Sequence, residues 1–301
     1  MIVILLASLI MVLLACLMAW ILGWANRAFH VEVDPRVSAV LDALPGANCG
    51  ACGYVGCGEY AEAAASGEAP PDLCPVGGDS CAQAVAEILG IEVGQKLPFR
   101  PVVHCGATYD KRLIHSEYRG EPSCRSANLV GGVQACTYGC LGFGDCERSC
   151  PFDAIHVIDG LARVDYEKCT GCGACARVCP RNIIHMIPFK SERVMVVACS
   201  NHDPGKYVRQ VCKVGCIGCG MCARKSDLFR VEDNLAHIDY DQYDPESMDE
   251  AQLALEKCPM NGILYIGEPG PEELEQTDGE DVGEPVRDEF QTTVDDTEWH
   301  G

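Results

Sequence analysis

Eight cysteines within residues 136–180 constrain the fold of this chain more than any other feature. They form two blocks that each end in Cys-Pro, and the second block has the spacing C-x2-C-x2-C-x3-C-P. In that spacing three close cysteines hold a [4Fe–4S] cube, and the Cys-Pro cysteine of the other block completes it. The ligand sets therefore cross. The predicted sets are Cys136, Cys140, Cys146 and Cys179, and Cys169, Cys172, Cys175 and Cys150.

The residues between the two blocks predict a β-hairpin. Residues 154–158 and 161–165 are each predicted to form a short strand. Asp159-Gly160 between them is a strong signal for a tight turn. This strand pair is typical of a two-cluster bacterial ferredoxin. A pair of structural zinc sites is the alternative, because zinc also binds four cysteines at short spacings. Eight interleaved cysteines with two Cys-Pro ends favour the clusters.

Cysteine content and charge exclude several classes of protein. The chain has 22 cysteines in 301 residues, clustered at C-x2-C spacing, which indicates metal binding rather than disulfides and a reducing compartment. The net charge of −21 argues against nucleic-acid binding through a basic surface. Residues 268–301 carry thirteen acidic side chains and one arginine, so we expect an acidic disordered tail there.

The first 26 residues contain no charged side chain, and their length suits a transmembrane helix. A signal peptide is the alternative, but the chain lacks a charged segment before the apolar run. Trp20, Trp24 and Arg27 at its end suit a membrane interface on the cytoplasmic side. We therefore expect a single pass, with the bulk of the chain in the cytoplasm. Cys16 is expected to be a small apolar residue within the helix.

A small four-cysteine domain is predicted after this helix. Its ligand pattern is C-x2-C-x4-C-x16-C-P, and glycines flank the first three cysteines. Four cysteines at this spacing hold either zinc or a cluster, and the neighbouring module favours a [4Fe–4S] cluster. Cys81 lies on the following predicted helix and is assigned to packing. The predicted ligands are Cys49, Cys52, Cys57 and Cys74.

The chain past residue 191 contains an internal repeat. Residues 161–166, LARVDY, match residues 235–240, LAHIDY, at an offset of 74. In the repeat, Ser226 stands at the expected fourth ligand position and Tyr243 stands where the first module has Cys169. If the ligand sets cross in the repeat as in the first module, one cluster lacks its ligands there and the other keeps all four. The predicted ligands of this fourth cluster are Cys216, Cys219, Cys222 and Cys258.

Four cysteines are left over from these sets, and we assign them to packing as structural thiols, with a further metal site as the alternative for the first two. They are Cys105, Cys124, Cys199 and Cys212. The predicted fold class is α+β. The predicted parts are a transmembrane helix (1–26), a [4Fe–4S] domain (27–91), a connecting segment (92–130), a two-cluster ferredoxin-like domain (131–190), a degenerate ferredoxin-like domain with one cluster (191–267) and the tail (268–301).

Three features together resemble the B-subunit of the Rnf ion-translocating oxidoreductase complex. They are the apolar N-terminal helix, the LPGANCGACGYVGC motif at residues 44–57 and the GCLGFGDCERSCPFDAI block at residues 139–155. The resemblance implies a subunit of a translocase in the cytoplasmic membrane of a bacterium or archaeon. Such a complex moves electrons between ferredoxin and NAD and couples this transfer to Na⁺ or H⁺ translocation. Its partners would be the other membrane and peripheral subunits and soluble ferredoxin.

The chain contains no catalytic dyad, P-loop or dinucleotide motif, so we predict electron transfer through [4Fe–4S] clusters and no other catalytic site. Two alternative functions are an electron-transfer subunit of a hydrogenase or quinone-linked oxidoreductase, and a membrane-tethered reducer of a redox-sensing regulator. Basic residues around the last cysteine block would steer an acidic partner, or form an ordinary solvated surface. They are Lys206, Arg209, Lys213, Arg224 and Lys225.

Overall fold

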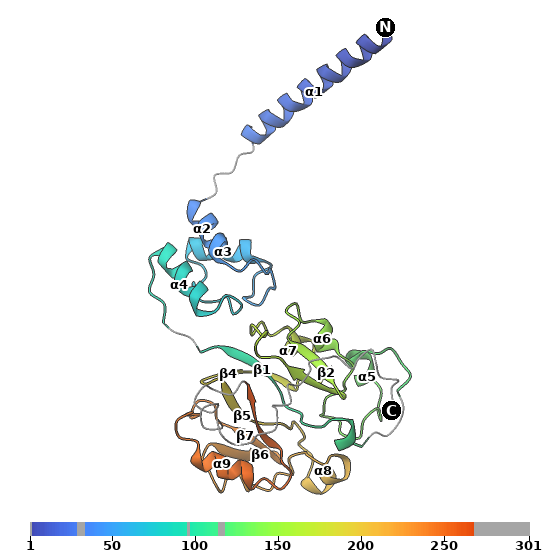
Figure 1. The fold of residues 1–301 in the computed structure, drawn as a ribbon, viewed down its shortest axis with the longest axis vertical. Coiled ribbons are helices and arrows are strands. Elements are labelled where there is room, and N and C mark those ends of the chain that lie inside the picture. The colour runs from blue at the N-terminus through green and yellow to red at the C-terminus, as the bar shows by residue number, and fades with distance from the viewer. Residues whose placement is uncertain (1, 29–33, 95–96, 114–117, 268–301) are drawn as a thin grey trace, which may run out of the picture.

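The computed structural model describes residues 2–28, 34–94, 97–113 and 118–267. The chain forms one long helix, then a helical domain (residues 35–89), then a first module (residues 99–188) and a second module (residues 193–267), as Figure 1 shows. The described strands form four antiparallel pairs. The fold is therefore α+β, as predicted. The predicted acidic tail lies outside the described residues.

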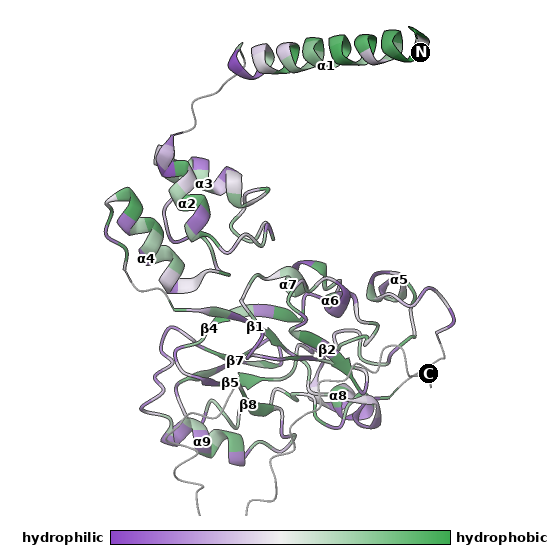
Figure 2. Ribbon diagram, turned by 45° about the horizontal axis from the view of Figure 1, so that its top comes forward, coloured by the Kyte–Doolittle hydropathy of each residue, from purple (hydrophilic) through white to green (hydrophobic). Residues whose placement is uncertain are grey.

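Helix α1 (Ile2–Ala28) coincides with the apolar segment predicted at the N-terminus. Its residues Ile4–Ala28 are long and apolar enough to cross a membrane, and none of this span is buried against the rest of the described chain. Figure 2 shows the helix as almost uniformly hydrophobic and separate from the other elements. An apolar helix with no protein partner requires either a lipid environment or another chain around it.

Three helices build the helical domain: α2 (Pro35–Ala43), α3 (Cys57–Ser66) and α4 (Gly78–Leu89). Helix α2 begins at the Asp34 cap, whose side chain accepts a hydrogen bond from the Arg36 amide, and Pro35 suits the first helical position. The core consists of Val40, Tyr60 and Val85, one fully buried side chain from each helix. This packing holds the loop of residues 44–57 against α3.

The first module contains two strand pairs. Strand β1 (Phe99–Val103) pairs with β4 (Ile184–Pro188), and β2 (Ile155–Ile158) pairs with β3 (Leu161–Val164). The predicted hairpin is confirmed, and its turn residues have the positive φ angles, 50° and 73°, that this tight turn requires. Short helices η1 (Tyr109–Lys111), α5 (Cys124–Asn128), α6 (Asp145–Arg148) and α7 (Ala174–Val178) surround the strands.

The second module repeats this arrangement. Strand β5 (Arg193–Val197) pairs with β8 (Ile263–Gly267), and β6 (Phe229–Glu232) pairs with β7 (Leu235–Ile238). In each module the first strand therefore pairs with the last, and a hairpin lies between them. Helices α8 (Gly205–Val211) and α9 (Asp249–Glu256) complete the module. The first strand, β1, comes from the predicted connecting segment 92–130, so that segment contributes to the first module.

Core packing replaces a cysteine block in the second module. Tyr243, which stands at the position of Cys169, is 3 % exposed, and its hydroxyl accepts a hydrogen bond from the Met195 amide at 3.0 Å. Helix α9 packs Ala251 and Ala254 into the same hydrophobic core. Aromatic and aliphatic side chains thus pack at the position equivalent to the cysteine triad of the first module.

Candidate metal centres

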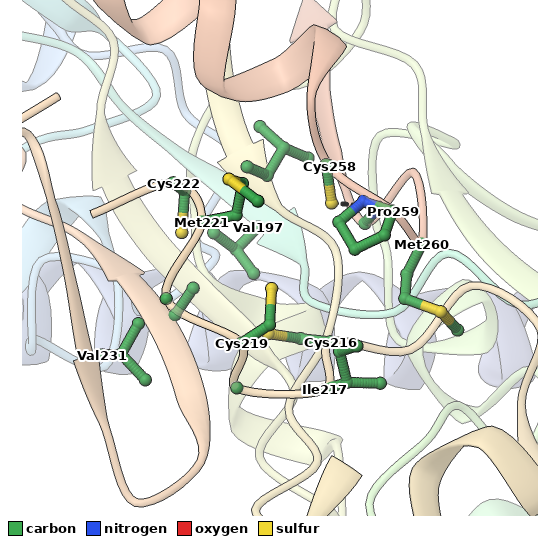
Figure 3. Close-up of a pocket in the computed structure, with 15 residues that line it drawn as sticks. Val197, Cys216, Ile217, Cys219, Met221, Cys222, Val231, Cys258, Pro259 and Met260 are labelled. Carbon is green, nitrogen blue, oxygen red and sulfur yellow. Dashed lines mark hydrogen bonds between the residues drawn. The ribbon is translucent and has the colours of Figure 1, made fainter. Parts of the chain in front are cut away.

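Four cysteines surround a cavity in the second module, which we call the second-module site: Cys216, Cys219, Cys222 and Cys258. Figure 3 shows their sulfur atoms around one common space. The first three lie on a loop between α8 and β6, and Cys258 follows α9. The space that these side chains surround, with the open solvent at its mouth, amounts to about 410 Å³. The structure thus brings together the four cysteines predicted for this module.

The loop that carries these cysteines depends on a glycine. Gly218 has a φ of +62°, and a Cβ atom there would lie 2.5 Å from the carbonyl oxygen of Asn234 in the hairpin turn. Gly142 makes the same close approach to the Gly160 carbonyl in the first module. Only glycine allows the loop to curve this closely around the cavity.

The first module has an equivalent site, which we call the α5 site because Cys124 begins α5. Its cavity has a volume of about 350 Å³ and is lined by Cys124, Cys140, Cys146 and Cys179. Cys136, which the sequence predicts for this set, does not line the cavity. The cysteine loops of the two modules align at an offset of 76, two more than the hairpins, and Phe143 then stands where the second module has Cys219. Phe143 is buried beside Cys124, so a thiol from α5 lies next to the position that lacks a cysteine.

Burial makes these thiols difficult to ionise without a metal. Desolvation raises the pKa of Cys124, Cys140 and Cys146, and the neighbouring thiols of the site add to the rise for Cys124 and Cys146. Burial also raises the pKa of Cys222 to about 11. A thiolate is the form that binds metal, so the positive charge of bound metal must replace the protons.

The other predicted set of the first module we call the α7 site: Cys150, Cys169, Cys172 and Cys175. Burial raises the pKa of Cys175 to about 12, and the nearby thiols at positions 169, 172 and 150 contribute. The Ala154 amide donates a hydrogen bond to Cys150 Sγ at 3.4 Å. The Thr170 hydroxyl, next to Cys169, is buried without a partner. The structure therefore places these four cysteines close together.

The N-terminal site comprises Cys49, Cys52, Cys57 and Cys74, on the chain between α2 and α4. Burial raises the pKa of Cys74, and the thiols of Cys52 and Cys57 raise it further. The Cys57 amide donates to Asn48 Oδ1 at 2.8 Å, which closes the loop that carries the first three cysteines. Cys81 lies beside Cys74 on α4, and its thiol donates to the Ala43 carbonyl at 3.4 Å.

The cysteine of each Cys-Pro pair shares one hydrogen-bonding pattern in three of these sites. An amide three or four residues downstream donates to its sulfur at 3.4 Å: Gly77 to Cys74, Ala154 to Cys150 and Gly262 to Cys258. Amide donors of this kind stabilise thiolates and tune iron–sulfur clusters. In the described ranges, no three His, Cys, Asp or Glu side chains converge on a point suited to a single ion. The donors in these sites are cysteine sulfurs, the ligand type that iron–sulfur clusters use.

Cys136 lines a different cavity, at the junction of the two modules. This junction cavity has a volume of about 380 Å³, and its lining includes Cys105, Cys136, Cys199 and Cys212. We expected Cys105, Cys199 and Cys212 to be structural thiols. The signal for them was present in the repeat: Cys105 and Cys199 end the matching segments VVHC and VVAC, and Cys136 and Cys212 each precede the next cysteine by four residues.

Two protein families match parts of the chain. Residues 44–76, which contain the N-terminal site, match the family described as "Putative Fe-S cluster". Residues 162–185, which contain the triad of the α7 site, match the family described as "4Fe-4S binding domain". Both matches agree with the donor sets described above.

Subunits of three ion-translocating oxidoreductase complexes are similar to this chain over most of its length. The B-subunit of the Na(+)-translocating ferredoxin:NAD(+) oxidoreductase complex from Acetobacterium woodii is 46% identical, over 80% of this chain and 72% of that protein. Its counterpart in the proton-translocating ferredoxin:NAD(+) oxidoreductase complex from Clostridium ljungdahlii is 40% identical, over 85% and 90%. The counterpart in the ion-translocating oxidoreductase complex from Methanosarcina acetivorans is also 40% identical, over 72% and 83%.

Proposed function

The chain belongs to the B-subunit family of Rnf-type ion-translocating oxidoreductase complexes, and we propose that it relays electrons between soluble ferredoxin and the other subunits of such a complex. It is an iron–sulfur electron-transfer subunit of an oxidoreductase that translocates ions. Its relatives are named for different ions, Na⁺ in one and protons in another.

We propose that four sets of cysteines each hold a [4Fe–4S] cluster. The N-terminal, α7 and second-module sites keep the sets expected from the sequence. In the α5 site, Cys124 replaces Cys136, because Cys124 lines the cavity with Cys140, Cys146 and Cys179. The proposal gives a two-cluster ferredoxin-like first module and a one-cluster second module.

When bound, [4Fe–4S] clusters supply reversible one-electron transfer. The protein holds the ligands, excludes water and donates hydrogen bonds to sulfur. The downstream amides of Gly77, Ala154 and Gly262 lie within 3.4 Å of a cysteine sulfur in the N-terminal, α7 and second-module sites, respectively. Because such hydrogen bonds favour the more negative reduced state, they raise the potential of the site that they contact.

The second-module site is the proposed docking point for ferredoxin. Of the cysteines proposed as ligands, all in the described chain, only Cys219 is exposed. Exposed basic side chains lie on α8, directly after it and on the loop after Cys222. They are Lys206, Arg209, Lys213, Arg224 and Lys225. Positive charge beside an accessible site favours encounter with an acidic electron carrier.

Helix α1 is the proposed anchor of the chain in the cytoplasmic membrane of a bacterium or archaeon. Arg27 lies near the end of its apolar span Ile4–Ala28. The positive-inside rule places such a basic residue on the cytoplasmic side of the membrane. The remaining domains would then face the cytoplasm in a single-pass topology, where ferredoxin and reduced thiols are found.

The observation that carries the proposal is the convergence of four thiols on one cavity in each module. Its test is iron and acid-labile sulfide analysis of the full chain, purified without oxygen, with EPR during titration by reduced ferredoxin. Cys219→Ser should remove about four iron and four sulfide per chain. Cys124→Ser should remove the same amount from a different EPR component. Stoichiometric zinc with negligible sulfide in the unaltered protein would contradict the proposal.

A further inference from the structure

Four cysteines outside the proposed cluster sites meet in the junction cavity, two from each module. Cys105 follows β1 and Cys199 follows β5, at equivalent ends of the two first strands. Cys136 and Cys212 each lie four residues before the first cysteine of their module's loop. The repeat has therefore kept the same pair of cysteines in both modules and has brought the two pairs together.

We propose that Cys105, Cys136, Cys199 and Cys212 bind a fifth [4Fe–4S] cluster at the junction of the modules. The inference rests on the proposed function, since it assumes that the chain carries such clusters elsewhere. It assigns a ligand role to every cysteine of the 22 except Cys16 in α1 and Cys81 in α4.

Nitrogen donors in the cavity wall point at the cysteine sulfurs. The Cys140 amide donates to Cys105 Sγ at 3.4 Å, and the Asn201 amide donates to Cys199 Sγ at the same distance. The buried Asn201 side chain also donates, through Nδ2, to Cys136 Sγ at 3.4 Å. A neutral thiol is a weak acceptor, so three donors on three sulfurs suit thiolates that ligate iron.

Two buried polar atoms in the cavity lining have no hydrogen-bond partner. They are Arg112 Nε and His104 Nε2, and the Arg112 residue is only 9 % exposed. A buried guanidinium with an unpaired nitrogen is costly unless negative charge lies nearby. A group ligated by four thiolates supplies that charge. The cavity wall therefore fits an anionic occupant.

Glycines keep the cavity open on both sides. A Cβ atom at Gly139 would lie 3.5 Å from Cys136 Sγ and 3.7 Å from Cys105 Sγ, and 2.7 Å from the Gln134 side chain. At the equivalent Gly215 it would lie 3.5 Å from Cys212 Sγ and 2.6 Å from Val208. Side chains at these positions would crowd the cysteines from which the proposed ligand set is built.

The junction site would connect the cluster sites of the two modules. Cys140, whose amide contacts Cys105, is itself a ligand of the α5 site. On the other side, Cys216, a ligand of the second-module site, lies close enough to Cys199 for the two thiols to interact electrostatically. The thiolates of the junction site are therefore in direct contact with ligand residues of both neighbouring sites.

The test uses the full chain purified without oxygen, with iron, sulfide and zinc analysis and EPR after reduction with dithionite. Cys105→Ser in the first module and Cys199→Ser in the second should each remove about four iron and four sulfide, and the same single EPR component. Local unfolding would instead remove the components that belong to the altered module. Cys16→Ser in α1 is the control, because this cysteine lies outside every proposed ligand set, and it should leave the iron content unchanged.

The outcomes separate the two proposals. Unchanged iron in both Cys105→Ser and Cys199→Ser, with loss of iron in Cys219→Ser, would overturn the fifth site and leave the proposed function intact. One zinc per chain that disappears in these variants would also overturn it. Absence of iron and sulfide from the unaltered chain would contradict the proposed function itself.

Discussion

Asn201 connects two sulfurs of the junction site through its backbone and its side chain. It is 2 % exposed, and its Nδ2 lies 3.4 Å from Cys136 Sγ. A hydrogen bond to sulfur favours the reduced state of a cluster. Asn201→Ala removes this hydrogen-bond donor, so the midpoint potential of the junction component should fall. One hydrogen bond of about 1 kcal/mol corresponds to roughly 40 mV for one electron. Redox titration followed by EPR measures the shift.

The control for this prediction is Asn234→Gly. Asn234 lies in the hairpin turn of the second module with a φ of 63°, which glycine tolerates, and its Nδ2 donates to the exposed His202 carbonyl instead of a sulfur. All potentials should stay unchanged in this variant. An unaltered junction potential in Asn201→Ala would show that its side chain does not act on the site.

Tyr243 shows how one residue replaces a ligand by packing. Its ring is 3 % exposed in the core of the second module, and its hydroxyl accepts from the Met195 amide. Tyr243→Ala should lower the free energy of unfolding of this module by about 3–5 kcal/mol, because it leaves a cavity. Tyr243→Phe should cost about 1–3 kcal/mol, because the buried amide loses its partner. Urea titrations measure both.

Iron content distinguishes the packing role of Tyr243 from a role in ligation. Folded Tyr243→Phe protein should retain all of its iron and sulfide, since no proposed ligand is altered. A loss of about four iron per chain in this variant, with the fold intact by circular dichroism, would mean that the position still belongs to a cluster site.

At the scale of elements, the contact between each cysteine loop and its hairpin turn decides whether the ligands meet. Gly218→Ala places a Cβ 2.5 Å from the Asn234 carbonyl oxygen in a left-handed conformation, and should destabilise the module by about 2 kcal/mol or more. Its cluster should bleach at lower urea concentration, as absorbance would report. Gly131→Ala is the control, because nothing lies within 4 Å of a Cβ there. Equal urea midpoints for the two variants would contradict this account.

Local patterns in the sequence were sufficient to predict most of these elements. The predicted hairpin of the first module is confirmed, because alternation and turn chemistry act over a few residues. The pairing of β1 with β4 was missed, because it joins residues about 80 positions apart, from Val103–Ile184 to Phe99–Pro188. No local signal identifies the partner of a strand over such a separation.

The candidate sites were predictable where a motif kept its spacing. The second-module set follows from crossed ligation, and the structure brings its four cysteines to one cavity. In the α5 site, sequence proximity favoured Cys136, whereas the fold brings Cys124 from α5. Alignment of the cysteine loops at an offset of 76 shows why this set was hard to predict. Phe143 occupies a ligand position, and Cys136 is equivalent to Cys212.

At the scale of the molecule, the cysteine sets follow one another from the end of the chain that carries α1 toward the second module. A cavity between the helical domain and the first module is lined by both Cys74 and Cys169, so the N-terminal and α7 sites face a common space. The junction cavity lies between the α5 site and the second-module site. A row of closely spaced sites suits a subunit whose relatives are named as parts of ferredoxin:NAD(+) oxidoreductase complexes.

The end of this row determines how an electron carrier would dock. Gly205, the first residue of α8, packs against Ile217 in the wall of the second-module cavity, so Lys206 and Arg209 on α8 lie close to that site. Both side chains are exposed. Reversal of both charges, Lys206→Glu with Arg209→Glu, should slow reduction by ferredoxin about tenfold at low ionic strength. Stopped-flow absorbance of the clusters measures this rate.

The salt dependence identifies the cause of such a decrease. The difference between the unaltered chain and the double variant should shrink as ionic strength rises toward 1 M, where the Debye length is about 3 Å. Arg36→Glu reverses an exposed charge on the helical domain and should leave the rate unchanged, since its partner Asp34 is also exposed. A rate that is equal in all three proteins at low salt would exclude α8 from the docking surface, and ferredoxin would then reach the row of clusters at another site.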